Sequence, residues 1–138
     1  MKVLLQRVNH ASVTVENSSV GAIQQGLLLL VGFGVGDTES KIPPLVEKIS
    51  NLRVFSDERG RFNYSVRDIE GAILLVPQFT LFADTKKGRR PEFFAALDPI
   101  EAKRLFEILI QEFKKVETLE VASGIFVAYM QVKLENDG

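Results

Sequence analysis

The sequence contains no cysteine and only one histidine among its 138 residues. Without cysteine the chain has no disulfide, no thiolate nucleophile and no cysteine metal site, which fits a cytosolic protein. A Ser–His–Asp or Cys–His mechanism would have to use His10, which lies in the middle of an expected strand. We therefore disfavour His10 as a general base, and we expect no histidine-based metal site and no cofactor.

Long apolar runs and a strong charge imbalance are also absent. No run approaches the roughly 18 apolar residues that a membrane helix needs, and the apolar run at 27–35 is punctuated by glycine. The N-terminus lacks the long apolar stretch and the small-residue cleavage site of a signal peptide. The net charge of −1 argues against nucleic-acid binding by bulk electrostatics. We expect a cytoplasmic protein without membrane contact, in which any nucleic-acid contact is local.

One stretch, residues 74–94, combines a buried strand with polar and cationic residues. An apolar run ends at Pro77, which has no N–H to continue a strand ladder. Gln78 and Thr80 follow as a polar pair among apolar neighbours. A loop around Gly88 then carries four cations: Lys86, Lys87, Arg89 and Arg90. This order suits a site for a polar ligand that carries phosphate. The alternative is that Gln78 and Thr80 only form hydrogen bonds with loop backbone and that the cationic loop is an ordinary solvated turn.

Strand patterns dominate the first third of the chain. We expect strands at 2–16, 20–23 and 27–35, with a hairpin turn at 16–19. Arg7 falls on the apolar parity of the first strand, which favours a bulge near Val8 over an inward-pointing arginine. Glycines at 32, 34 and 36 have the spacing G-x-G-x-G, and no parallel crossover is evident after them. They favour close strand packing over dinucleotide binding.

Two amphipathic helices are expected later, at about 43–52 and 98–116, with a short helix at 91–97 between them and the cationic loop. Residues 37–40 supply N-cap candidates for the first helix. Asp98 caps the second helix and Pro99 occupies its first position. Further strands are expected at 53–55, 72–76, 118–121 and 125–135. The fold class is α+β: one domain with a strongly bent, largely antiparallel, barrel-like sheet and two main helices packed on one side.

The sequence resembles the D-aminoacyl-tRNA deacylase family, also called D-tyrosyl-tRNA deacylases, along essentially its whole length. Several separate motifs appear in the family's order and at similar spacing, which makes the match specific. They are Leu-Gln-Arg-Val at 5–8, Gly-Asp-Thr-Glu at 36–39, Asn-Leu-Arg-Val-Phe at 51–55, Pro-Gln-Phe-Thr-Leu at 77–81, Lys-Gly-Arg-Arg-Pro at 87–91, Gly-Ile-Phe at 124–126 and Asn-Asp-Gly at 136–138.

The resemblance implies a cytosolic homodimer with active sites at the subunit interface. Such a dimer hydrolyses the ester between a D-amino acid and the 3′-terminal adenosine of tRNA, without a metal. Gln78, Phe79 and Thr80 are then the catalytic residues. Because no histidine is placed to activate Thr80 as a nucleophile, we favour backbone N–H groups near Phe79 and Thr80 as the oxyanion site. An alternative is an impaired paralogue or truncation that binds tRNA ends or a partner without turnover.

The same resemblance assigns the remaining site residues. Arg7 supports the partner subunit's chirality-reading loop, and Phe126 and Met130 flank the terminal adenosine. Leu81 and Gly138 complete the residues expected to bind substrate. The cations expected to contact tRNA phosphates are Lys86, Lys87, Arg89 and Arg90.

The sequence departs from the family at three places. Pro77 stands where the family has serine, and Val127 stands where it usually has glycine, so a β-branched side chain there is expected to narrow the adenosine pocket. The family's chirality filter is a Gly-Pro pair, and the sequence ends at its glycine, Gly138. The expected domain, 1–138, therefore lacks the family's last C-terminal strand, which puts stereoselectivity in question.

Overall fold

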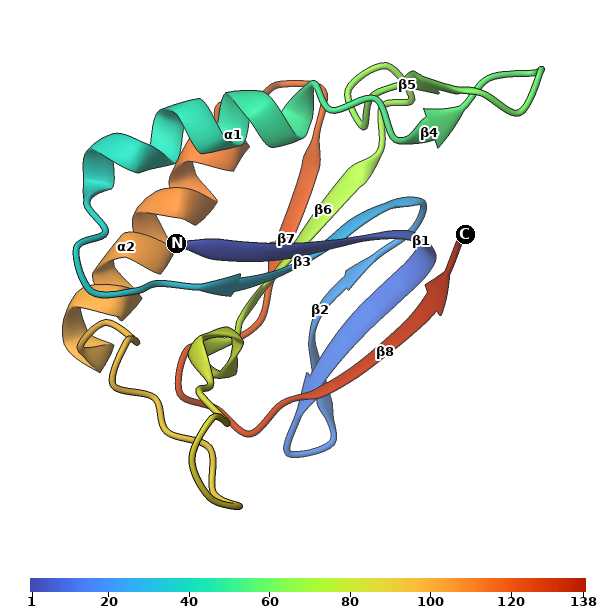
Figure 1. Ribbon diagram of the computed structural model, residues 1–138. Helices are drawn as coiled ribbons and strands as arrows, with labels where there is room; N and C mark the ends of the chain where they lie inside the picture. The colour runs from blue at the N-terminus through green and yellow to red at the C-terminus, as the bar shows by residue number, and fades with distance from the viewer.

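The computed structural model describes residues 1–138 (Figure 1). The first strand, β1 (Lys2–Val15), pairs with three other strands of the sheet. Its first half pairs antiparallel with β3 (Gly26–Gly32). Its second half pairs antiparallel with β2 (Ser18–Ile23) through a tight hairpin, and also with β8 (Gln131–Asn136) from the other end of the chain. The strand therefore joins the two ends of the sequence in one sheet.

A bulge in β1 reverses the faces of this strand. The pairing of β1 with β8 shifts register between Val8 and His10, as the sequence predicted. Before the bulge Leu5 packs toward the helices, whereas after it Val13 belongs to the cluster on the opposite face. Arg7 precedes the bulge and so stays on the face of Leu5, where its part-buried side chain bonds to Val54 O and Asp137 O. The bulge and an inward-pointing arginine, which the sequence analysis treated as alternatives, therefore both occur.

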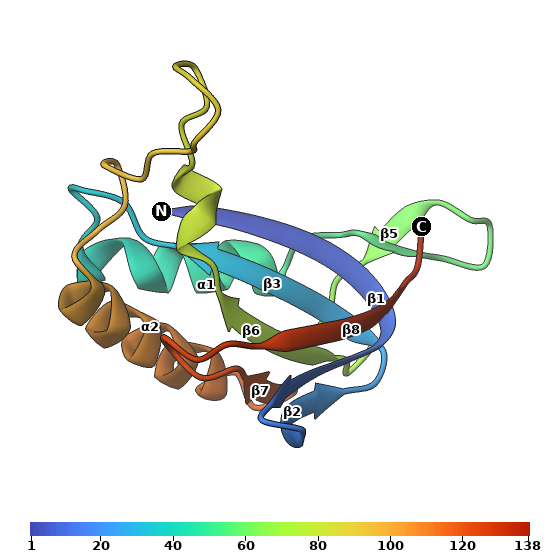
Figure 2. The same cartoon turned by 90° about the horizontal axis from the view of Figure 1, so that it is seen from below.

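The rest of the sheet is parallel. The strand order is β2-β1-β3-β6-β7, in which β6 (Ala72–Pro77) runs parallel to both β3 and β7 (Glu120–Ser123). The connections pass through α1 (Ile42–Ser50) and α2 (Pro99–Lys114), which lie together on one side of the sheet (Figure 1). The expectation that no parallel crossover follows the glycines is wrong. The sheet is mixed and strongly bent, so that it nearly closes on itself (Figure 2).

Short elements complete the chain. A separate ribbon projects from the sheet, formed by β4 (Phe55–Ser56) and β5 (Phe62–Tyr64). Two 3₁₀ helices, η1 (Glu39–Lys41) and η2 (Phe79–Phe82), precede α1 and follow β6. No helix is long and apolar enough to cross a membrane.

The helix-side core confirms the predicted stripe of α2. Its buried members are Ala102, Leu105, Phe106, Leu109 and Phe113. Burial of each large side chain stabilises the fold by about 1.5–3 kcal/mol. Asp98 caps the helix as predicted, since its Oδ1 accepts from the N–H groups of Ile100 at 3.0 Å and Glu101 at 3.4 Å. Helix α2 thus fixes the segment immediately before it, which lines the site described below.

Three local predictions are wrong. Residues 91–97 do not form a helix, because backbone bridges pair Asp84 with Glu92 and Gly34 with Ala96 and leave only a turn at 94–95 between them. The last strand begins only at Gln131, and residues 125–130 form a loop. Helix α1 has no side-chain N-cap from residues 37–40.

Candidate active site

The polar pair of the sequence lies where β6 leaves the sheet. The N–H of Gln78 donates to Val31 O at 2.7 Å, which extends the ladder by one residue beyond Pro77. The chain then turns into η2, where Leu81 N donates to Gln78 O at 3.3 Å. Because a 3₁₀ turn bonds each N–H to the third residue before it, the N–H groups of Phe79 and Thr80 have no acceptor within the turn.

Gln78 and Thr80 interact directly. The side-chain amide of Gln78 donates to the hydroxyl of Thr80, and Gln78 is half-buried while Thr80 is exposed. No histidine joins them: His10 lies 3.8 Å from Glu135 in the β1–β8 pairing. A hydroxyl held as an acceptor keeps its own proton available for a ligand or for water, so the pair suits positioning and not nucleophilic attack.

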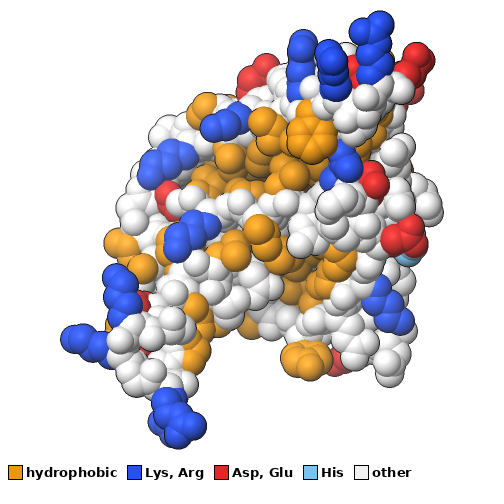
Figure 3. Space-filling model, turned by 45° about the vertical axis from the view of Figure 1, so that its right-hand side comes forward, with side chains coloured by type: hydrophobic (Ala, Val, Ile, Leu, Met, Phe, Trp, Pro, Cys, Tyr) orange, Lys and Arg blue, Asp and Glu red, His pale blue; other side chains and the backbone are white.

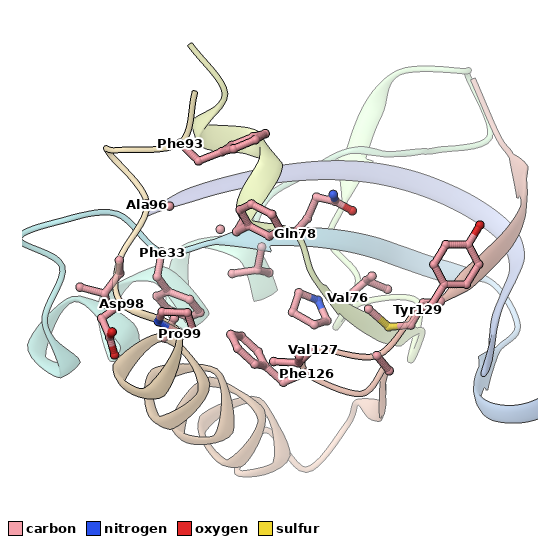
Figure 4. Close-up of a pocket in the computed structure, with 18 of the residues that line it drawn as sticks. Phe33, Val76, Gln78, Phe93, Ala96, Asp98, Pro99, Phe126, Val127 and Tyr129 are labelled. Atoms are coloured by element: carbon pink, nitrogen blue, oxygen red, sulfur yellow. The ribbon is translucent and has the colours of Figure 1, made fainter. Parts of the chain in front are cut away.

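A pocket of about 680 Å³ opens beside this pair (Figure 4). Its walls are the end of β6 with η2, the segment 93–99, and the loop 126–130. Of its 19 lining residues, 14 are hydrophobic, so the pocket suits the apolar faces of a ring system with few polar anchors. Of the residues predicted from the sequence, Gln78, Phe79, Phe126 and Met130 line this pocket. Thr80 and Leu81 do not line it.

Aromatic rings close one side of the pocket. The rings of Phe79 and Phe93 meet edge to face, with centroids 5.0 Å apart and planes at 65°. Phe33, from the segment after β3, lines the same wall (Figure 4). No sequence pattern singled out Phe33 or Phe93, because Phe33 lies in a segment predicted as a strand and Phe93 in one predicted as a helix.

The departure at Val127 falls on the rim of this pocket. Its φ of +67° is in the left-handed region that favours glycine, and its side chain lines the pocket while remaining 83% exposed. The backbone conformation therefore supplies a physical reason for glycine at this position.

Arg7 and Gly138 lie together, but away from the pocket that they were expected to serve. Arg7 Nε donates to Asp137 O at 2.7 Å, and Nη1 donates to Val54 O at 2.6 Å. The guanidinium also pairs with Asp137 Oδ2 at 3.0 Å. A Cβ on Gly138 would lie 2.6 Å from Arg7 Nη2. Neither residue lines the pocket, so within one chain they form a separate cluster at the C-terminus.

The cationic loop projects from the body of the molecule at the end of η2 (Figures 1 and 3). Asp84 and Glu92 exchange two backbone hydrogen bonds at its base, and Gly88 adopts a φ of +72° at its tip. Four exposed cations without a carboxylate partner occupy this loop: Lys86, Lys87, Arg89 and Arg90. Unpaired cations on an exposed loop are free to meet an anionic ligand.

Asp37 is a buried acid. The sequence pattern predicted it as an N-cap candidate for α1, but it does not cap that helix. It pairs with the N-terminal ammonium, accepts from Gly34 N at 2.8 Å, and pairs with Lys41 at 3.0 Å. Burial tends to raise the pKa of Asp37, but these hydrogen bonds and charges outweigh it and hold the pKa below its ordinary value. Asp37 thus ties the start of β1 to the backbone after β3.

Comparisons with known proteins agree with this geometry. A family model described as D-Tyr-tRNA(Tyr) deacylase matches residues 4–138. The chain is 47% identical to the D-aminoacyl-tRNA deacylase of Thermosipho melanesiensis and 51% identical to that of Alcanivorax borkumensis. Both matches cover all of this chain and 92% and 94% of the relatives.

A solved structure named c-Myc DNA Unwinding Element Binding Protein superposes with a TM-score of 0.89 at 39% identity, over 99% of this chain and 93% of that one. The matching fold therefore extends over the mixed sheet, both helices and the pocket. On the family model and the curated relatives together, this chain belongs to the D-Tyr-tRNA(Tyr) deacylase family.

Proposed function

We propose that the chain hydrolyses the ester bond between a D-amino acid and the 3′-terminal adenosine of tRNA. The observation that carries this proposal is the hydrogen bond between Gln78, which lines an apolar pocket, and the exposed Thr80 beside it. The chain shares about half its residues with curated D-aminoacyl-tRNA deacylases. Membership of the deacylase family supports this reaction. The pocket is proposed to hold the ester and the terminal nucleoside.

The proposed chemistry is attack of water on the ester carbonyl. The tetrahedral intermediate then expels the ribose oxygen, which takes up a proton as the C–O bond breaks, leaving a free amino acid and a tRNA with an intact 3′ end. The unpaired N–H groups of Phe79 and Thr80 are placed to stabilise the developing oxyanion. The vicinal ribose hydroxyl assists the water, and the Gln78–Thr80 pair orients it. Phe126 and Met130 flank the adenine ring.

The projecting loop is proposed to contact phosphates near the tRNA end. Replacing Lys87 and Arg89 together by alanine should weaken tRNA binding and reduce the slope of log K against log salt by about 2 for a duplex-like contact. The measurement is a tRNA-binding titration at several salt concentrations. Lys48→Met, on the exposed face of α1, is the control for loss of a cation elsewhere. An unchanged slope would remove the loop from the binding surface.

We also propose a cytoplasmic homodimer in which the Arg7–Gly138 cluster of one subunit serves the pocket of the other. The separation of this cluster from its own pocket supports the arrangement. Inactive Gln78→Ala and Arg7→Ala proteins can be mixed and refolded together. If the cluster acts across subunits, each mixed dimer has one intact site and activity returns. If it acts within a subunit, no intact site forms and activity stays absent.

The experiment that tests the function is hydrolysis of D-tyrosyl-tRNA beside L-tyrosyl-tRNA at catalytic enzyme concentration. Loss of the D-ester alone supports a stereoselective deacylase. Loss of both esters means that the chemistry is intact but that these 138 residues lack the chirality filter. Loss of neither, by a protein shown to be folded, would favour the alternative of a protein that binds tRNA ends without turnover. The Gln78→Ala protein is the matched control.

A further inference from the structure

The turn η2, which carries Phe79 and Thr80, is held at its far end by the first strand. Lys2 Nζ donates to Leu81 O at 3.0 Å and lies 4.7 Å from the centre of the Phe82 ring. The last carbonyls of a short helix have no donor within it, so the ammonium satisfies one of them. A cation over an aromatic face adds a second attraction to the same turn.

The Phe82 ring of η2 also packs directly against the backbone of Gly32 and Gly34. A Cβ on Gly34 would lie 2.5 Å from Phe82 Cε1, and a Cβ on Gly32 would lie 3.2 Å from the same ring and 2.8 Å from Gln78 O. The Phe82 ring therefore packs against β3 and the residues after it at a distance that no side chain would allow. Figure 2 shows η2 lying over the start of β1 and the end of β3.

We propose that Lys2, Phe82 and the glycines at 32 and 34 form a clamp that positions η2 for catalysis. Lys2 and Phe82 do not line the pocket, so they are positioning residues that act through Phe79 and Thr80. A displacement of about 1 Å in such groups can cost about 100-fold in rate. The inference about rate depends on the proposed deacylase function, whereas the inference about position does not.

The first test replaces Lys2. Lys2→Met keeps the aliphatic stem and removes the donor, whereas Lys2→Arg keeps a donor. The expected result for Lys2→Met is a kcat about 10-fold lower with KM unchanged, because the turn is misplaced but the pocket still binds. Lys2→Arg should restore most of kcat, and Lys48→Met should change neither parameter. A rise in KM alone would make Lys2 a tRNA contact and would overturn the clamp.

The second test is a cycle between Gly34→Ala and Phe82→Leu. Gly34→Ala should lower kcat by at least about 10-fold in the natural background, because the new methyl group displaces the ring. In the Phe82→Leu background the same change should cost less than about 3-fold, because the smaller side chain leaves room. If Gly34→Ala lowers kcat by the same factor in both backgrounds, the Phe82 ring and Gly34 do not act together, and the proposal is overturned.

The third test needs no turnover. Hydrogen exchange of the Leu81 and Ala83 amides, which bond within the turn, should become about 10-fold faster in Lys2→Met, while the β1–β3 amides keep their protection. Unchanged exchange at these amides overturns the clamp, even in an active enzyme. Faster exchange in a protein whose natural form hydrolyses neither ester would support the clamp and overturn the deacylase function alone.

Discussion

The side-chain amide of Gln78 donates a hydrogen bond to the hydroxyl of Thr80, two residues further along the chain. This bond occupies the hydroxyl as an acceptor and brings no base that could remove its proton. The two residues therefore form one polar pair beside an apolar pocket. Because no base is placed to remove the proton of the Thr80 hydroxyl, we expect Thr80 to position substrate and water and not to attack the ester.

Thr80→Val replaces the hydroxyl by a methyl group of similar size. If Thr80 only positions substrate and water, kcat for D-aminoacyl-tRNA should fall roughly 10- to 100-fold, as for a misplaced group. A nucleophile would lose more than about 10⁴-fold. Single-turnover hydrolysis of D-tyrosyl-tRNA measures the difference. Thr80→Ser keeps the hydroxyl and is expected to retain most activity. A loss of kcat above about 10⁴-fold in Thr80→Val, with Thr80→Ser still active, would show that Thr80 is the nucleophile.

Arg7→Met should destabilise the fold by about 2 kcal/mol, because three polar interactions to Asp137 and Val54 are lost and the Val54 carbonyl is left without this donor. The guanidinium also lies over the rings of Phe55 and Phe62. Urea denaturation measures the change in free energy of unfolding. Arg59→Met, on the exposed end of the β4–β5 ribbon, is the control and should change stability by less than about 0.5 kcal/mol. Equal effects of the two changes would contradict the account of Arg7.

Val127→Gly should stabilise the protein by about 1 kcal/mol, because a β-branched residue is costly at a φ of +67°. The side chain is exposed, so little burial is lost in return. Thermal unfolding should show a higher midpoint. The matched control, Val132→Gly in β8, removes a half-buried side chain from ordinary strand conformation and should lower the midpoint. A lower midpoint for both would mean that the packing of Val127 outweighs its backbone strain.

Asp37→Asn should destabilise the protein by about 2 kcal/mol at neutral pH, because it leaves the N-terminal ammonium of the half-buried Met1 without its carboxylate partner. The folded pKa of Asp37 lies below its ordinary value of 3.8. Its stabilisation is therefore fully present well above pH 3.8 and is lost as the pH falls through the folded pKa.

Urea denaturation at pH 7, 5 and 3 tests this dependence. The difference between the natural protein and Asp37→Asn should be constant from pH 7 to pH 5 and smaller at pH 3. Glu107→Gln, in an exposed pair with Lys103, should change stability little at any of these pH values. A difference that stays constant down to pH 3 would show that the charge of Asp37 is not what stabilises the fold.

Sequence patterns predicted the elements whose environment is local and periodic. Helix α2 has its predicted cap at Asp98 and its predicted stripe, because a helix face repeats along the chain. The buried strand β6 and the bulge near Val8 were also predicted, since both follow from the alternation of apolar residues.

The wrong predictions concern segments whose shape is set by distant partners. Residues 91–97 have a helical pattern, but backbone bridges to Asp84 and Gly34 hold both ends of the segment and prevent a helix. Residues 125–130 alternate like a strand, but Val127 adopts a left-handed conformation that no pattern reveals. Asp37 sits in a run of cap-forming residues, whereas its partner is the N-terminal ammonium. Tertiary contacts override local propensity at these places.

Of the candidate site, Gln78, Phe79, Phe126 and Met130 line one pocket, and their roles stay predictions. Lys2 and Phe82 were missed, because a lysine at the start of a strand and a phenylalanine after a polar pair carry no pattern. The roles proposed for them rest on tertiary contacts alone: the bond from Lys2 to Leu81 O and the approach of the Phe82 ring to Gly34.

The pairing of β1 with β8 sets an order of events during synthesis. The second residue of the chain begins a strand whose outer edge is completed by residues 131–136. At roughly 5–20 residues per second, a ribosome needs roughly 6–26 s to reach that partner. During this time the nascent strand presents unpaired N–H and C=O groups beside its hairpin with β2. Closure of the sheet between β1 and β8 is therefore a late, long-range step, because it must wait until residues 131–136 have been made.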